Sequence, residues 1–254
     1  MIRPRVIPVL LLQNRGLVKT VRFKDPTYLG DPINIVRIFN DKEVDELIFL
    51  DITATAENRP PAFDLLSDIT SECFMPLGYG GGIRSMDDIR RLLSLGVEKV
   101  ILNTAAVEDP ALVRTAADYA GSSSVVVSMD VRKGLLGGRY EVLMRNGKKR
   151  TGRDPVKHAV AMEKSGAGEL FINSIDRDGT MQGYDIDLVR SISAAVSVPV
   201  VACGGAGKLQ DLADIIKLGG ASAAAAGSLF VFQGPLRGIL ISYPAQADLE
   251  RILP

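Results

Sequence analysis

The sequence predicts a (β/α)8 barrel, the TIM-barrel class of α/β protein, and three observations support this prediction. Eight short apolar runs of strand length begin near residues 5, 46, 75, 98, 124, 169, 198 and 222. Helical patterns separate nearly all of them, and continuous apolar strands are typical of a parallel sheet buried on both faces. Eight strand–helix units in 254 residues also match the usual size of such a barrel. An open doubly wound sheet is the alternative, and it fits eight units less well.

The sequence also contains an internal repeat. Residues 75–106 and residues 198–229 each read as a buried strand, a glycine turn, an amphipathic helix, a glycine stop and a second buried strand. Gly204 follows Gly81 by 123 residues, and Gly219 follows Gly96 by the same distance. Self-similarity at a fixed offset indicates a repeated structural unit. We therefore expect one domain over residues 1–254, built from duplicated half-barrels at about residues 1–122 and 123–254.

The composition is that of a globular protein with a large core, since 46% of the residues are hydrophobic and 24% are charged. The formal net charge is zero, which argues against a nucleic-acid partner, and no apolar run is long enough to span a bilayer. Pro4 and Pro8 interrupt the first apolar run, so we interpret it as a buried strand rather than a signal peptide. Cys73 and Cys203 are expected to be free thiols of a cytoplasmic protein. A single histidine argues against a histidine-ligated metal, and we expect no metal and no other cofactor.

The first half of the chain follows the barrel pattern with one exception. Residues 5–12 are the first strand, but residues 14–30 are polar with little apolar periodicity, which predicts a long functional loop. Asp31 and Pro32 then begin a helix, with aspartate as the N-cap and proline at the first helical position. We expect this helix at residues 33–42, a strand at 46–51, a loop at 53–61, a helix at 63–72, the first repeat unit, and a helix at 110–119.

The second half begins with a strand at residues 124–131. Residues 133–151 then predict a small hairpin that turns at Asn146 and Gly147. Asp154 and Pro155 repeat the helix start seen in the first half. We expect a helix at residues 156–165, a strand at 169–173, a glycine- and aspartate-rich loop at 174–183, a helix at 187–195, and the second repeat unit. Residues 234–254 predict a short helix near Arg237 that covers the end of the barrel.

Two glycine sets follow the strands at the end where barrels place their active sites. One set is Gly81 and Gly82 with Asn103 and Thr104, and the other is Gly204 and Gly205 with Gly227 and Ser228. Such turns present backbone N–H groups to an anion at the start of a helix. The alternative is that the glycines merely permit tight turns. Their presence in two copies favours a phosphorylated small molecule with anionic groups at both ends.

Asp130 is the acid/base candidate, because it ends a valine-rich strand and should point into the mouth of the barrel. Desolvation there would raise its pKa towards the range useful for general acid catalysis. The alternative is a structural aspartate bonded to the backbone or to Arg132. Asp176, which we assign to the substrate site, and Asp178 lie in the loop at residues 174–183; they either bind substrate hydroxyls or cap the turn. Asp51 either orients a ligand or anchors the loop that follows its strand.

Four charged residues stand at or near the starts of strands, at the opposite end of the barrel. Two cations and two anions could close a ring across this face, or form an ion-pair layer that only stabilises the fold. These residues are Arg5, Glu46, Lys99 and Glu169.

Several motifs together resemble the HisF subunit of imidazole glycerol phosphate synthase over essentially the whole chain. They include DELIFLDITA, GGGIRS, KVILNTAAV, VVVSMDVR, SIDRDGTMQGYD and CGGAG. The resemblance implies a lyase (cyclase) reaction of histidine biosynthesis on a bis-phosphorylated ligand. It also implies ammonia from a HisH-like glutaminase docked at the N-terminal face of the barrel. The residues it marks are a catalytic Asp130, phosphate contacts from Gly82, Asn103, Thr104, Gly205, Gly227 and Ser228, and an ammonia gate of Arg5, Glu46, Lys99 and Glu169.

One departure from the family pattern bears directly on the chemistry. The family's first strand ends in Cys-Leu-Asp-Val, whose aspartate is the second member of the acid/base pair, and Leu11 stands in its place here. Leucine transfers no protons, and general acid/base help is commonly worth about 10² to 10⁴-fold. A smaller departure is Gly227, where the family usually has alanine.

A narrower resemblance is to the HisF-like WbuZ/AglZ proteins of surface-polysaccharide gene clusters, which are acetamidino modification proteins. Residues 3–40, the stretch CFMPLGYGGGIRS and the late ISYP carry this resemblance. It implies a HisH-like glutaminase and an ATP-using amidotransferase partner that together form an acetamidino sugar for a polysaccharide such as O-antigen. Three hypotheses stay open: this ammonia-channelling role, which Leu11 favours; a conventional cyclase, which Asp130 and both cradles favour; and a non-catalytic scaffold that regulates the glutaminase.

Overall fold

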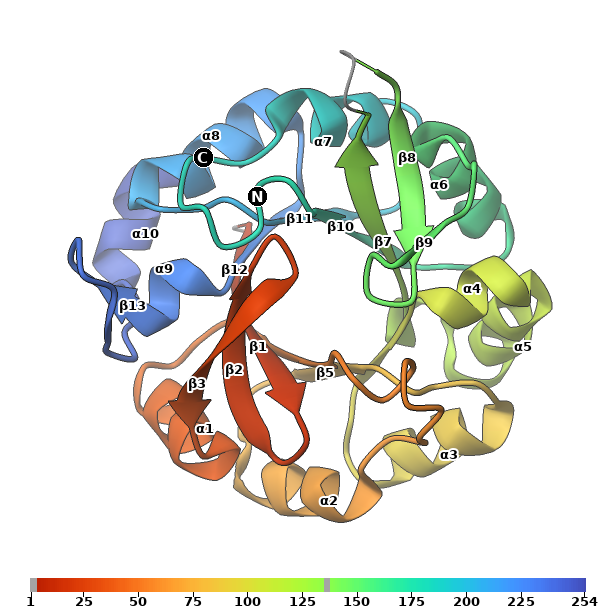
Figure 1. Ribbon diagram of the computed structural model, residues 1–254, viewed down its shortest axis with the longest axis horizontal. Coiled ribbons are helices and arrows are strands. Elements are labelled where there is room, and N and C mark those ends of the chain that lie inside the picture. The colour runs from red at the N-terminus through yellow and green to blue at the C-terminus, as the bar shows by residue number, and fades with distance from the viewer. Residues whose placement is uncertain (1–3, 135–137) are drawn as a thin grey trace.

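The computed structural model describes residues 4–134 and 138–254, which form a closed barrel of parallel strands inside a ring of helices (Figure 1). Each barrel strand pairs with the next, and the last returns to the first through the register pair Val6 and Ala224. The barrel strands are β1 (Arg5–Gln13), β4 (Leu47–Asp51), β5 (Leu77–Gly80), β6 (Lys99–Leu102), β7 (Val125–Lys133), β10 (Glu169–Ser174), β11 (Val200–Cys203) and β12 (Ala223–Ala226). The predicted (β/α)8 barrel is confirmed, with all eight strands close to their expected positions.

Helices cover the outside of the barrel. They are α1 (Pro32–Asp41), α2 (Phe63–Glu72), α3 (Met86–Ser94), α4 (Thr104–Glu108), α5 (Pro110–Ala120), the 3-10 turn η1 (Ser122–Ser124), α6 (Pro155–Lys164), α7 (Ile186–Ser193), α8 (Leu209–Gly219), α9 (Ser228–Val231) and α10 (Gln246–Ile252). Both Asp-Pro helix starts are confirmed, since Asp31 accepts a hydrogen bond from Asn34 N at 3.1 Å and Asp154 accepts one from Lys157 N at 3.0 Å. Among the described residues, no helix combines the length and apolar character needed to cross a membrane.

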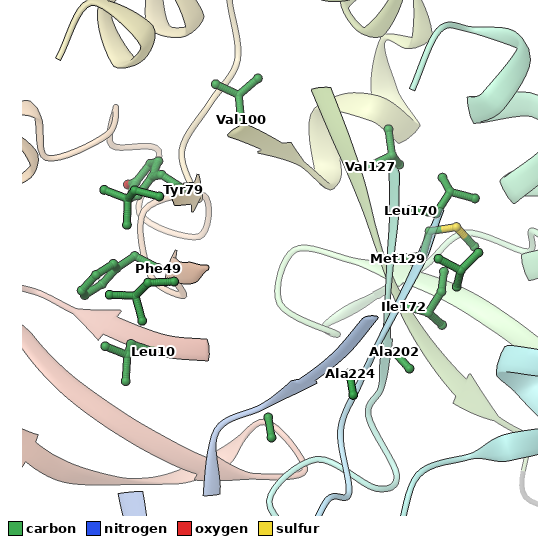
Figure 2. Close-up of a cluster of buried hydrophobic side chains, with 14 of the residues drawn as sticks. Leu10, Phe49, Tyr79, Val100, Val127, Met129, Leu170, Ile172, Ala202 and Ala224 are labelled. Carbon is green, nitrogen blue, oxygen red and sulfur yellow. The ribbon is translucent and has the colours of Figure 1, made fainter. Parts of the chain in front are cut away.

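The core has two parts because side chains alternate between the two faces of each strand. The larger part lies between strands and helices, and Figure 2 shows Leu10, Phe49 and Tyr79 within it. The smaller part fills the barrel interior with the residues Ile7, Val9, Ile48, Ile101, Val126, Phe171, Val201, Cys203, Ala223 and Ala225. The same alternation turns Leu11 of β1 and Asp130 of β7 inward at the C-terminal end of the barrel.

The predicted loop at residues 14–30 is wrong, because these residues form an antiparallel hairpin. Its strands are β2 (Gly16–Val21) and β3 (Lys24–Gly30), and β2 continues the sheet from β1 through the pair Leu11 and Val18. Lys19 is buried, so a polar side chain fills a core position in β2 and hides the strand signal. In Figure 1 the hairpin lies in front of the barrel opening. A segment expected to be irregular is therefore a regular pair of strands at the barrel mouth.

The tail also differs from expectation. Instead of a helix near Arg237, two short strands, β13 (Phe232–Gln233) and β14 (Gly238–Ile239), form a hairpin. The helix comes later, as α10, and the Tyr243 hydroxyl before it donates to Val6 O at 2.9 Å. The hairpin predicted within residues 133–151 is confirmed as β8 (Tyr140–Met144) and β9 (Lys149–Arg150), joined by a turn at Asn146 and Gly147. Residues 135–137 of that predicted segment lie outside the described residues.

Candidate functional site

A pocket opens at the C-terminal ends of the barrel strands, where this fold places its chemistry. It draws together most of the site residues that the sequence predicted from both halves of the chain. Those lining it are Gly81, Asn103, Thr104, Asp130, Gly204, Gly205, Gly227 and Ser228. Gly82 lines an adjoining cavity, which shares Gly81, Asn103 and Thr104 with the pocket. Asp176 lines neither the pocket nor the adjoining cavity.

Asp130 is buried at the floor of this pocket. The pKa of its carboxyl group is raised to about 7, mainly because the group is buried. The hydrogen bond from Asn103 lowers the pKa, and the negative charge of Asp178 raises it. The Asn103 amide donates to the Asp130 carboxylate at 3.1 Å, across the neighbouring ends of β6 and β7. A carboxyl group with a pKa near neutral pH is suited both to give and to take a proton.

Leu11 lines the same pocket from the end of β1. It pairs with Leu50 of β4, so this side of the pocket is apolar. The other two carboxylates that line the pocket are engaged. Asp51 accepts from the backbone N–H groups of the turn after β4 and from Arg59, and Asp178 binds a lysine. Among the described pocket-lining residues, Asp130 is the only carboxylate that binds neither a cation nor a backbone N–H.

The glycine turns after β5 and β11 are held by close backbone contacts. Gly81 and Gly205 have φ angles of 117° and 116°, which side-chain-bearing residues rarely adopt. A Cβ atom would lie 2.4 Å from Asp51 O at the first position and 2.2 Å from Gly183 O at the second. The glycines are therefore required for packing, whatever they bind. The matching turns in the two halves place the two glycine sets at corresponding strand ends around the pocket.

The β2–β3 hairpin adds residues that the sequence reading did not assign to the site. Lys19 lines the pocket, is buried, and donates from Nζ to the Asp178 carboxylate at 2.7 Å. The other carboxylate oxygen of Asp178 accepts from the Thr20 hydroxyl at 3.1 Å. No local signal marks Lys19, because residues 14–30 lack the apolar periodicity of a strand. A Cβ atom at Gly227 would lie 2.9 Å from Lys19 Cε, so glycine at this position makes room for the lysine.

Asp176 takes a different place from the one expected of a substrate ligand. Its carboxylate accepts a hydrogen bond from the backbone N–H of Lys133 at 2.8 Å. Its carbonyl oxygen accepts one from Arg22 Nε at 3.2 Å. The residue therefore joins the loop after β10 to the end of β7 and to the β2–β3 hairpin. Asp178, two residues later, is the loop aspartate that reaches the pocket.

The four charged residues at the barrel's N-terminal end assemble as a ring. Lys99 Nζ donates to Glu46 at 2.9 Å and to Glu169 at 2.8 Å. The Arg5 guanidinium donates to the same two glutamates, one through each terminal nitrogen. Both glutamates are buried, whereas the two cations are partly exposed to solvent. The ring thus crosses the N-terminal end of the barrel, and its charges alternate in sign.

No group of three potential metal-ligating His, Cys, Asp or Glu residues occurs in the part of the chain that the structure describes. The site brings together an acid/base candidate, two glycine turns, a buried lysine–aspartate pair and an apolar wall at Leu11. Groups of these kinds are suited to proton transfer and to binding an anion.

Comparison with known proteins agrees with this architecture. A family model described as "Histidine biosynthesis protein" matches residues 5–236. The chain is 55% identical to "Putative imidazole glycerol phosphate synthase subunit hisF2" of Pseudomonas aeruginosa, over 98% of this chain and 99% of that protein. It is 49% identical to a protein of Leptospira borgpetersenii whose name likewise designates a HisF subunit, with full coverage of both. It is 44% identical to "Imidazole glycerol phosphate synthase subunit HisF" of Alkaliphilus metalliredigens, over 91% of each chain. The chain therefore belongs to the histidine biosynthesis protein family, among its HisF-like members.

Proposed function

We propose that this chain is the ammonia-accepting barrel subunit of a glutamine amidotransferase complex, and that the complex forms an acetamidino group on a surface-polysaccharide sugar. Membership among HisF-like proteins supports the first part. The observation that carries the second is Leu11, which lines the pocket with Asp130 where the family resemblance leads one to expect a second carboxylate. With leucine at this position, and with Asp51 and Asp178 engaged elsewhere, Asp130 has no partner carboxylate among the described residues with which to form an acid/base pair.

The ends of the barrel support a path for ammonia. The ring of Arg5, Glu46, Lys99 and Glu169 stands at the N-terminal end, and the pocket opens at the other. Phe74 precedes β5, which places it at the N-terminal end, and its side chain is 84% exposed. Aromatic residues are enriched at protein–protein interfaces, so Phe74 is a candidate contact at this face. This supports a HisH-like glutaminase docked at that face, with ammonia passing through the ring.

The pocket end of the barrel then delivers ammonia to the acceptor. Converting an acetamido group to an acetamidino group replaces a poor leaving oxygen by nitrogen, and this requires that the oxygen first be activated. An ATP-using amidotransferase partner supplies that activation in the proposed complex. The barrel contributes an anion-binding mouth, and Asp130 is placed to take a proton from incoming ammonium.

A conventional cyclase of histidine biosynthesis is the second candidate. The pKa of Asp130, raised by burial to about 7, and the two glycine turns favour it. The names of the relatives also describe subunits of imidazole glycerol phosphate synthase. This candidate requires that a single carboxyl group serve both proton-transfer steps.

Turnover separates the two candidates. The purified chain is mixed with an ammonium salt and the bis-phosphorylated ribulosyl precursor of the histidine pathway, and imidazole product is measured. We expect little or none. Rapid turnover at a rate typical of enzymes, about 1 s⁻¹ or faster, would overturn the proposal and establish the cyclase. A HisF subunit that retains both aspartates serves as the positive control in the same assay.

A further inference from the structure

The β13–β14 hairpin carries one residue that turns back towards the pocket. Its residues from Gln233 to Leu240 are exposed, except Arg237, which is half-buried. Arg237 has a φ of 52°, in the left-handed region that residues other than glycine rarely occupy. Its backbone N–H donates to Gly234 O at 3.0 Å and closes the turn. This turn holds the arginine in an unusual backbone conformation beside the mouth of the barrel.

The guanidinium of Arg237 lies between two residues of the pocket wall. One terminal nitrogen donates to the Ser228 hydroxyl at 3.3 Å, and the other donates to Gly179 O at 3.1 Å. Both acceptors line the pocket. The guanidinium carbon also lies 4.6 Å from the centre of the Phe232 ring, which limits its movement. A guanidinium has five N–H donors in a fixed fork, so these two bonds leave three for a ligand.

The charge of Arg237 is not balanced by a neighbouring acid. In the described ranges, no carboxylate forms an ion pair with it. Lys19 also lies against Gly227, but Asp178 neutralises its charge. Arg237 therefore places a positive charge that no described carboxylate pairs with next to the Ser228 hydroxyl.

The other glycine set has a different balance. There Arg145 lines the cavity with Gly82 and Thr104, and its backbone N–H donates to the Thr104 hydroxyl at 3.0 Å. Its guanidinium, however, pairs with Glu108 at 3.1 Å. The two sets match in their turns but differ in charge, since one arginine has an acidic partner and the other has none.

We propose that Arg237 is an anion-binding residue that completes the cradle of Gly204, Gly205, Gly227 and Ser228, so that this cradle takes a dianionic phosphate group. The fork of the guanidinium matches two oxygens of such a group. The inference deepens the proposed function, because it assigns the more highly charged end of the ligand to the Ser228 side. Arg237 lies just beyond residue 236, where the match to the family ends. The charge preference is therefore assigned to a residue outside the segment that the family model matches.

Titration calorimetry with inorganic phosphate on the full chain tests the proposal. Arg237→Gln keeps donors but removes the charge, and Arg237→Gly removes the side chain while adopting the positive φ freely. We expect both changes to weaken phosphate binding about tenfold or more. We expect Arg145→Gln to weaken it less than about threefold, because that charge is already paired at the surface. Arg251→Gln, an exposed arginine on α10 paired with Asp248, is the matched control and should bind as the unmodified chain does.

Three results would overturn the proposal: no phosphate binding by the unmodified chain, unchanged binding in both Arg237 variants, or a larger loss from Arg145→Gln. Thermal unfolding of each variant shows that a loss of binding is not a loss of fold. Electron density from crystals soaked in phosphate should appear beside Ser228 before it appears beside Thr104. Because phosphate binding needs no turnover, its failure leaves the conclusion from Leu11 in place, and rapid cyclase turnover leaves the role of Arg237 in place.

Discussion

Leu11 and Asp130 face the same pocket from β1 and β7, the first strands of the two predicted half-barrels. Each is the last inward-facing residue before its strand leaves the barrel, so the two occupy corresponding places. One is apolar, and the other is a buried carboxyl group whose pKa is raised by burial to about 7. The fold keeps the geometry of a catalytic pair while supplying one member of it.

Replacing Leu11 by aspartate restores the missing carboxyl group. We expect cyclase activity in the ammonia-dependent assay to rise by about 10²-fold or more, the scale of general acid/base catalysis. A second carboxylate near Asp130 also adds like-charge repulsion in a desolvated site, so unfolding free energy should fall by roughly 1–3 kcal/mol. The measurements are initial rates of imidazole formation and urea unfolding.

Leu11→Asn is the matched control for that change, because its amide is similar in size but transfers no proton. It should leave the cyclase rate low. If Leu11→Asp folds and gains nothing over Leu11→Asn, the missing carboxylate does not explain a low rate. The explanation would then lie elsewhere in the pocket.

The barrel and its pocket could be predicted from the sequence because their signal is periodic. Apolar strands such as residues 125–131 and capped helices such as α6 repeat at regular spacing, and glycines with positive φ mark the turns. This placed Asp130 and both glycine sets at the pocket without the structure. The charged ring at the opposite end followed from the same periodicity, since its members begin the strands.

The β2–β3 hairpin and the tail could not be predicted by the same route. Lys19 is buried because Asp178, 159 residues later, neutralises it, and no local pattern reports a partner so distant. Arg237 adopts a positive φ that its residue type disfavours, so the sequence suggested a helix instead. The different places of Asp176 and Asp178 could not be predicted either, because two aspartates of one loop differ only in the groups that the fold brings to them.

The Asp130 carboxyl group should make stability depend on pH. Its pKa is about 7 in the folded chain against 3.8 ordinarily, so between these values the folded state holds a proton that the unfolded state has released. Stability therefore falls as pH rises from about 4 to about 7. At about 1.4 kcal/mol per pKa unit, the full cost of ionising Asp130 is on the order of 4 kcal/mol.

Asp130→Asn measures this contribution. The free energy of unfolding, measured by urea unfolding, should rise for the variant relative to the unmodified chain as pH rises from 5 to 8. The difference between the two proteins is the quantity to compare, because burial lowers the pKa of His158 to about 4 and gives an opposite pH trend in both. Asp87→Asn, an exposed aspartate on α3, should show no such gain. A difference that stays constant with pH would contradict the raised pKa.

The ring at the N-terminal end should matter for ammonia that comes from the glutaminase. Lys99→Ala removes one of the two cations. In the complex with the glutaminase, we expect formation of the amidinated sugar from glutamine to fall, whereas its formation from added ammonium salt is retained. Arg5 still contacts Glu46 and Glu169, so unfolding free energy should fall by less than about 3 kcal/mol. Lys42→Ala, an exposed lysine at the same end, is the control. Equal loss with both nitrogen sources would remove the gate assignment.

The Lys19–Asp178 pair should hold the β2–β3 hairpin over the pocket. Asp178 contacts Lys19 at 2.7 Å and the Thr20 hydroxyl at 3.1 Å, and both charged side chains are buried. Lys19→Met leaves a buried carboxylate without its cation, so we expect a loss of roughly 3–5 kcal/mol in unfolding free energy. Asp178→Asn leaves a buried ammonium group and should cost a similar amount.

The double variant distinguishes a coupled pair from two separate roles. With both charges removed, no uncompensated charge remains, so Lys19→Met with Asp178→Asn should be more stable than either single variant. Urea unfolding of all four proteins gives the coupling energy, and hydrogen exchange of the β2 amides shows whether the hairpin stays docked. Losses that simply add would mean that the two side chains act independently. The ion pair would then not be what holds the hairpin, and Lys19 would be available to a ligand rather than committed to the fold.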